Sequence, residues 1–127
     1  MAIPDSRVLG RVVQHPIDFL DFFPADPTLS TVSATCSEVS ALCPVTGQPD
    51  IYTVIIEYNP VGRVIESKSL KLFLWRFRDQ RIGCEDLAST VARDLHAQHS
   101  TEYTVTTIQQ SRGGIVLRAT AKIGDHR

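Results

Sequence analysis

The spacing of hydrophobic positions changes along the chain, and the changes predict the order of its elements. Residues 28–42 are rich in threonine, serine and valine, and they predict an irregular strand. Residues 51–58 favour a second strand, which Asn59-Pro60 ends. Val54, Ile55 and Ile56 are consecutive, so both faces of this strand are apolar at its centre and both need cover.

Two helices are predicted in the middle of the chain. Residues 67–78 place four apolar side chains at helical spacing: Leu70, Phe73, Leu74 and Phe77. A second helix is expected from about residue 85 to residue 96, with acidic residues in its first turn, where they suit the helix dipole. Gly83 separates the two helices.

The C-terminal part predicts two further strands. Residues 103–109 alternate weakly, residues 115–123 alternate clearly, and Arg112-Gly113-Gly114 predicts a tight hairpin turn between them. The order β-β-α-α-β-β predicts an α+β fold, in which an antiparallel sheet carries two helices on one face. The other face would be left open, and self-association is the simplest cover for it.

The N-terminal 27 residues are expected to form an extended arm, because four prolines surround an aromatic and acidic patch. Its aromatic side chains should pack on the rest of the chain, since so much apolar surface is rarely left exposed. We therefore predict an arm at residues 1–27 and one domain at residues 28–127.

Composition narrows the function classes. The chain has 127 residues, is 43% hydrophobic and 21% charged, and carries a net charge of −1, which is typical of one soluble domain. This near-neutral charge argues against a nucleic-acid partner, and no apolar run is long enough to span a membrane. The three cysteines and four histidines lack ligand spacing, so we expect no metal site and a cytoplasmic location.

The segment Cys-Pro-Val-Thr-Gly-Gln-Pro-Asp at residues 43–50 carries candidate chemistry. Pro44 and Pro49 restrict the backbone and Gly47 permits a turn, so the segment predicts a stiff loop. Such a loop could hold Cys43 as a nucleophile and Asp50 as a proton donor at fixed separation. The alternative is a polar turn with an inert cysteine.

Charged residues near both helix starts are the other candidates. One face of the first predicted helix carries Lys68, Lys71 and Arg78. Cations at the start of a helix oppose its dipole, which suggests a functional reason for them. These side chains could bind the phosphates of a dinucleotide. The alternative is a solvated helix face. Glu85 could accept hydrogen bonds from the N–H groups of a guanine-like ring, or could simply suit the dipole of the second helix.

These motifs together closely resemble the QueF family, the NADPH-dependent 7-cyano-7-deazaguanine reductases of queuosine biosynthesis, in its short single-domain form. The resemblance runs from about residue 17 to residue 123. It rests on residues 43–50, on Glu-Ser-Lys-Ser-Leu-Lys-Leu at residues 66–72, on Phe77-Arg78 and Glu85-Asp86, and on Arg112-Gly113-Gly114.

The resemblance implies a tunnelling fold, whose subunits form a ring around an oligomeric barrel and share active sites at their interfaces. It implies that Cys43 forms a thioimide with the nitrile carbon, that Asp50 donates a proton, and that two NADPH molecules reduce the adduct. The free deazaguanine base would be the substrate. Residues implied to hold its ring are Ile65, Glu66, Ser67, Cys84 and Glu85. Residues assigned to the phosphates of NADPH are Lys68, Lys71 and Arg112.

Cys84 is the departure from the family pattern, which has a histidine before the glutamate. A cysteine offers only a weak hydrogen-bond donor and no charge. The alternatives are therefore a related amidinotransferase, in which another group attacks the thioimide, or a ring protein that binds deazapurines without turnover.

Overall fold

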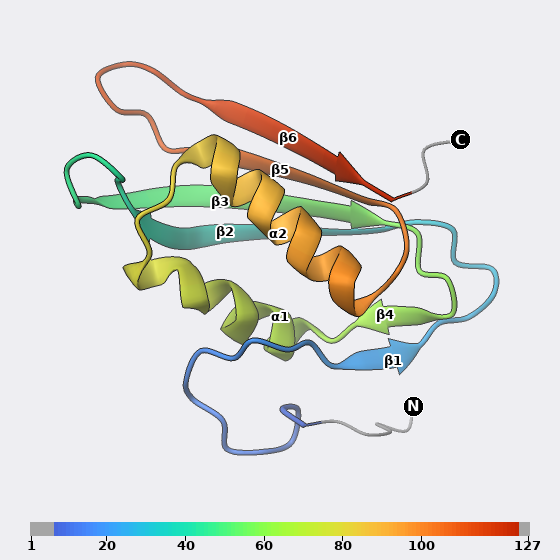
Figure 1. The fold of residues 1–127 in the computed structure, drawn as a ribbon. Coiled ribbons are helices and arrows are strands. Elements are labelled where there is room, and N and C mark those ends of the chain that lie inside the picture. Colours follow the sequence, from blue (N-terminus) through green and yellow to red (C-terminus); the bar gives the residue numbers. More distant parts are fainter. Residues whose placement is uncertain (1–6, 125–127) are drawn as a thin grey trace.

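The computed structural model describes residues 7–124 and shows an antiparallel sheet with two helices on one face (Figure 1). The main sheet has the order β2 (Val32–Leu42), β3 (Pro49–Tyr58), β5 (Tyr103–Gln109) and β6 (Arg118–Ile123). The helices are α1 (Ser67–Trp75), which the 3-10 turn η1 (Arg76–Asp79) continues, and α2 (Cys84–Gln98). The predicted order β-β-α-α-β-β is confirmed. A small second sheet, β1 (Phe22–Pro24) with β4 (Arg63–Ile65), is an addition.

Three strand boundaries differ from the expected ones, and the first strand begins at Val32 rather than at residue 28. Asp50 pairs with Ala41 inside the β2–β3 ladder, so it belongs to β3, and the connecting loop is residues 43–48. The last strand begins at Arg118 rather than at residue 115. The reason is that Arg112 and Ile115 already close a tight turn through two backbone hydrogen bonds of 3.0 Å. The three apolar residues that follow this turn are consequently exposed.

The side chain of Glu66 fixes the start of α1. Its carboxylate accepts hydrogen bonds from the backbone N–H groups of Lys68 and Ser69, the latter at 2.8 Å. Such a cap satisfies donors that have no partner within the helix. The face predicted to be apolar is buried against the sheet, while Lys71 and Arg78 are exposed.

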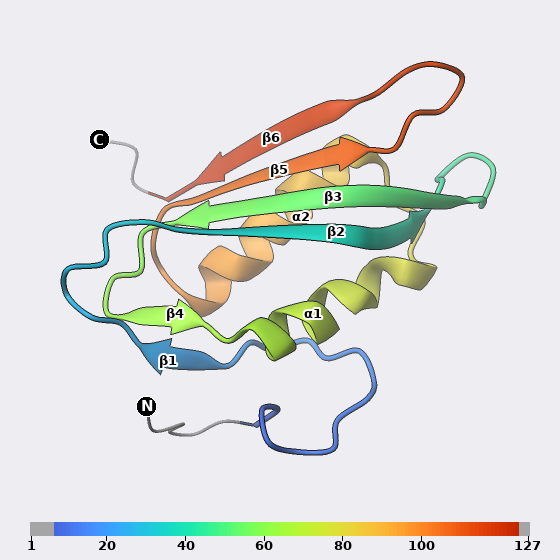
Figure 2. The same ribbon diagram turned by 180° about the vertical axis from the view of Figure 1, so that it is seen from behind.

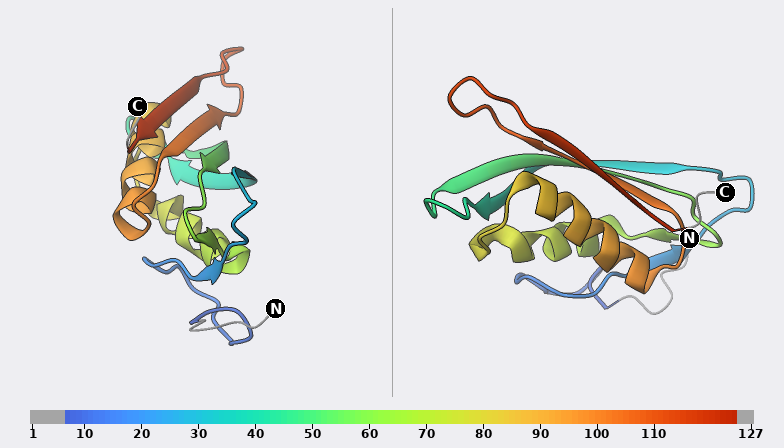
Figure 3. Two further views of the ribbon diagram at one scale, coloured as in Figure 1. Left: turned by 90° about the vertical axis from the view of Figure 1, so that its right-hand side faces the viewer. Right: turned by 45° about the horizontal axis from the view of Figure 1, so that its top comes forward.

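The core lies between the helices and one face of the sheet, as Figures 2 and 3 show from behind and from the side. Tyr52, Val54 and Ile56 alternate along β3 and are buried on the helix side. Ile51 and Ile55 point to the opposite face, where Ile51 is 40% exposed and Ile55 is half-buried. Among residues 7–124 no element covers this second face, as the sequence predicted.

The arm packs on the same core. Ile17 and Leu20 are buried, and Phe19 and Phe22 pack against the core, which confirms the packing expected for the aromatic side chains. Lys68 holds the arm from α1, because its Nζ donates a hydrogen bond of 2.8 Å to the carbonyl oxygen of Arg11. No helix within residues 7–124 is long and apolar enough to cross a membrane.

Candidate active site

Two backbone hydrogen bonds close the loop at residues 43–48, for which the sequence predicted a stiff backbone. Cys43 N–H donates to the carbonyl of Gln48 at 2.8 Å, and Gly47 N–H donates to the carbonyl of Cys43 at 2.9 Å. Gly47 has a φ of 74° and lies against Arg81, so a Cβ there would be 2.6 Å from the guanidinium Nη2. The positive φ favours glycine at this position, whereas the Arg81 guanidinium, at the end of a flexible side chain, could move to admit a Cβ.

The thiol of Cys43 is half-buried and chemically activated. Hydrogen bonds from the Thr46 side chain and from the backbone N–H groups of Thr46 and Val45 lower the pKa of the Cys43 thiol, although burial and the charge of Asp50 oppose this effect. Thr46 N lies 3.5 Å from the sulfur. Because the thiolate is the nucleophilic form, these donors favour attack by Cys43.

The carboxylate of Asp50 is buried and forms an ion pair with Arg112. Arg112 lies in the β5–β6 turn, and its second nitrogen donates to Gln48 Oε1 at 2.6 Å. The guanidinium thus joins two loops that are 62 residues apart in sequence.

The start of α2 adjoins the hairpin loop. Leu42 exchanges backbone hydrogen bonds with the segment just before α2, and a Cβ at Gly83 would lie 3.8 Å from Glu85 Oε1 and 3.9 Å from Pro44 Cγ. Glu85 is exposed there. Cys84, by contrast, is 1% exposed.

Ile65 lies at the other end of the sheet, and α1, which carries Ser67, Lys68 and Lys71, runs from that end back toward the hairpin (Figures 1 and 2). Ile65 N–H donates to the hydroxyl of Tyr58 at 2.9 Å, and Tyr58 follows Asp50 by eight residues along β3. At about 3.3 Å per residue, these two strand positions are ~26 Å apart. One chain therefore does not bring Ile65 to Cys43, and Arg112 lies with Asp50 and Gln48 rather than with the two lysines.

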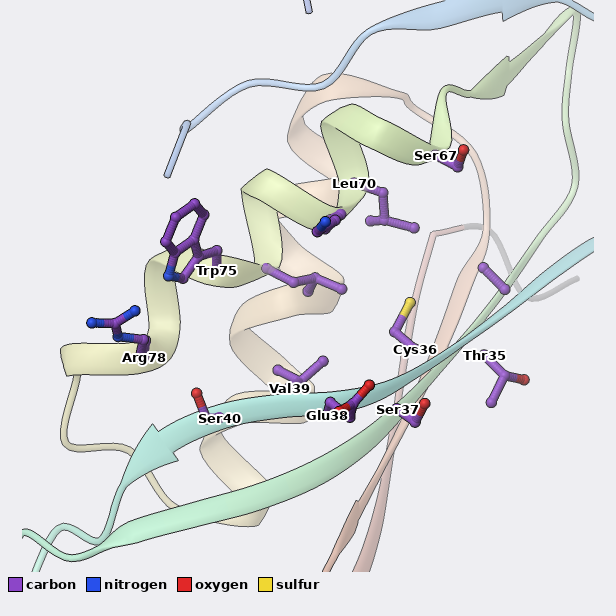
Figure 4. Close-up of a pocket in the computed structure, with 13 residues that line it drawn as sticks. Thr35, Cys36, Ser37, Glu38, Val39, Ser40, Ser67, Leu70, Trp75 and Arg78 are labelled. Carbon is purple, nitrogen blue, oxygen red and sulfur yellow. The ribbon is translucent and has the colours of Figure 1, made fainter. Parts of the chain in front are cut away.

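A groove of about 760 Å³ runs between β2 and α1 and includes Ser67 and Lys71 (Figure 4). Trp75 and Arg78 line its other end, and burial raises the pKa of the Cys36 thiol on its β2 side. On the far side of Lys71 is a smaller cavity of about 360 Å³, in which Arg11 joins Lys68 and Lys71.

Two residues of the site were not predicted from the sequence. Arg11 comes from the arm, and no local pattern connects it with α1. Tyr52 lies in β3 two residues after Asp50 and therefore on the same face of the strand, a signal that strand alternation could have given.

The Cys43 thiol with its lowered pKa on the β2–β3 hairpin, and the buried carboxylate of Asp50 near it, are the candidate site on this α+β scaffold. The chain belongs to the QueF-like protein family, whose sequence model matches residues 49–127. A relative from Frankia casuarinae is 44% identical over 103 residues, which cover 80% of this chain and 82% of that protein. A relative from Parabacteroides distasonis is 42% identical over 87 residues, which cover 68% of this chain but only 55% of that longer protein.

Both relatives are named NADPH-dependent 7-cyano-7-deazaguanine reductase. A solved structure, the archaeosine synthase QueF-Like in the apo form, aligns with a TM-score of 0.71 and 23% identity. The alignment covers 77% of this chain and 97% of that one, and it supports the tunnelling fold that the sequence predicted.

Proposed function

We propose that the chain reduces the nitrile of 7-cyano-7-deazaguanine to an aminomethyl group, as a step that supplies queuosine biosynthesis. The observation that carries the proposal is the activated Cys43 thiol, held on a rigid loop beside Asp50 and Glu85, in a chain whose relatives bear that name. The substrate is the free base, and two NADPH molecules are consumed for each nitrile.

The proposed chemistry begins with a bond from Cys43 Sγ to the nitrile carbon. The nitrile nitrogen takes one proton, and a thioimide results; Asp50 delivers this proton after Arg112 has moved away and the carboxylate has taken up a proton from solvent. NADPH, when bound, supplies the two hydrides. A second proton and loss of the sulfur complete the conversion of R–CN to R–CH₂–NH₂ and return Cys43 to its starting state. The former nitrile carbon stays bonded to Cys43 Sγ during the first hydride transfer.

The groove between β2 and α1 fits the cofactor. Its volume suits a dinucleotide, and Trp75 offers an aromatic face beside cationic Lys71 and Arg78 (Figure 4). Lys68 and Lys71 remain the proposed partners of its phosphates, and Arg11 is added to them. Arg112 could contribute only after leaving Asp50.

The two ends of the sheet can form one site only between two copies of the chain. In this arrangement Glu85 of one copy binds the deazaguanine ring from one side, and residues 65–67 of another copy bind it from the other. Glu66 would act there by holding the start of α1 in place, since its carboxylate caps α1 and its backbone N–H donates to the Asp21 carbonyl. The open sheet face, with Ile51 exposed, supports self-association into a ring.

The test is to mix the protein with the nitrile, with and without NADPH, and to follow thioimide absorbance and NADPH loss. Cys43→Ala should abolish both signals, while Cys36→Ala, the matched loss of a half-buried thiol, should retain them. Turnover in Cys43→Ala, or an adduct mapped by mass spectrometry to Cys36, would show that the nucleophile is misassigned.

Position 84 favours one alternative function. The buried Cys84 sulfur lies 3.3 Å from Thr107 Oγ1 and supplies no cation for the reduction. If ammonia or another amine attacked the thioimide in place of hydride, the thioimide would still form but NADPH would not be consumed. A protein that only binds deazapurines would form no adduct.

If the chain is a slow reductase, Cys84→His should raise NADPH oxidation, by as much as ~10²-fold.

A further inference from the structure

The hydroxyl of Tyr52 is a buried polar group without a partner. Tyr52 is 1% exposed, and within residues 7–124 its Oη has no hydrogen-bond partner. The other two tyrosine hydroxyls are both satisfied: Tyr58 accepts from Ile65 N–H, and Tyr103 lies 2.7 Å from His99 Nδ1. Leaving such a donor unmet costs stability, and a phenylalanine would avoid the cost.

This hydroxyl lies among the residues of the candidate active site. Tyr52 shares the helix-facing side of β3 with Asp50. Across the ladder it pairs with Gln109, two residues from Thr107, which contacts the Cys84 sulfur. The charges of Asp50, Cys84, Cys43 and Glu85 all act on it. No other tyrosine is surrounded by these groups, since Tyr58 and Tyr103 lie at the far end of β3 and β5.

The environment keeps the hydroxyl protonated. Burial first, and then the charge of Asp50 and its neighbours, raise the pKa of Tyr52 to about 12. At neutral pH the group is therefore a hydrogen-bond donor that does not give up its proton. When a thiolate adds to a nitrile, negative charge develops on the nitrogen, and a fixed donor in an enclosed site stabilises that charge.

We infer that Tyr52 is a catalytic residue, whose hydroxyl donates a hydrogen bond to the nitrile nitrogen while Cys43 adds to the carbon. The inference rests on the proposed function and extends it. The proton that the nitrogen finally keeps still comes from Asp50. Tyr52 supplies the unmet donor that the ligand satisfies on binding.

The test compares Tyr52→Phe with Tyr103→Phe, because both changes remove one buried hydroxyl. Tyr52→Phe should form the thioimide about 10²-fold more slowly, with an unchanged or higher melting temperature. Tyr103→Phe should melt at a lower temperature, because it loses the contact with His99, and should form the adduct at the wild-type rate. A Tyr52→Phe protein that reacts at the wild-type rate, or that loses rate and melting temperature together, overturns the inference.

A second measurement separates this inference from the proposed function. In a Cys43→Ala background, which cannot form the adduct, the affinity for 7-cyano-7-deazaguanine is compared with that for 7-deazaguanine, which lacks the nitrile. Adding Tyr52→Phe should reduce the preference for the nitrile about tenfold. An unchanged preference would overturn the role of Tyr52 alone. A protein that binds neither base would overturn the proposed function and, with it, this inference.

Discussion

Replacing Arg112 with alanine should weaken the connection between the β5–β6 turn and the β2–β3 hairpin. Arg112 donates to the carboxylate of Asp50 and to Gln48 Oε1, so the substitution removes both contacts. It also leaves the Asp50 side chain, which is only 3% exposed, without a cation. A buried carboxylate that has lost its partner is poorly stabilised, so the folded state should lose stability.

The size of the loss follows from the two contacts. A hydrogen bond to a charged group contributes about 1.5–3 kcal/mol and a neutral one about 0.5–1.5 kcal/mol. The Arg112 side chain is 37% exposed. Solvent therefore screens its charge, and we place the total at the low end, at about 2 kcal/mol. For a domain of this size, each kcal/mol lowers the melting temperature by roughly 3–5 °C, so we expect a decrease of about 6–10 °C.

Thermal unfolding followed by circular dichroism, at one fixed protein concentration, measures this change. Arg118→Ala, which removes an exposed arginine from β6, is the matched control and should melt like the wild type. Asp50→Asn and the double variant with Arg112→Ala complete a double-mutant cycle, in which the two losses should not add. Additive losses, or an Arg112→Ala protein that melts like the wild type, would show that this ion pair does not form in solution.

Three further predictions concern the site itself. The Thr46→Val variant should shift the pH midpoint of adduct formation upwards, because the hydroxyl that lowers the pKa of Cys43 is gone; an unchanged rate profile against pH would exclude this cause. Arg11→Gln should raise KM for NADPH about tenfold and leave KM for NADH unchanged, since only NADPH carries a 2′-phosphate. The control Arg93→Gln, on the exposed side of α2, should change neither KM, and equal effects on both cofactors would contradict the assignment. Glu85→Gln should weaken substrate binding by about 1–3 kcal/mol, measured by calorimetry, and unaltered affinity would remove Glu85 from the ring site.

Local pattern was enough to predict the two helices and the four strands of the main sheet, but not the short β1–β4 sheet. The helical spacing from Leu70 to Phe77 gave α1, and strand alternation gave β3, because each reports which side chains face the core. The start of the last strand was misplaced because residues 115–117 are three consecutive apolar residues that continue into the alternating strand. Their backbone follows a turn that has already closed, which alternation does not reveal.

The site was less predictable from the residues, because its contacts join distant segments. Cys43 was found as a candidate from the stiff loop, and the resemblance supplied its role. The ion pair of Asp50 with Arg112 depends on how two loops meet in space, and no spacing in the sequence encodes it. The contribution of Arg11 depends in the same way on the path of the arm over α1.

The ~26 Å that separate the two ends of β3 have a genetic consequence if the proposed site spans two copies. A chain with Cys43→Ala is defective only at its hairpin end, and a chain with Lys71→Ala only at its α1 end. Each would be inactive alone. In rings assembled from an equal mixture, roughly one site in four would combine the intact end of each chain, so two inactive alleles would complement each other. Dominance and dosage would then depend on how freely the subunits exchange.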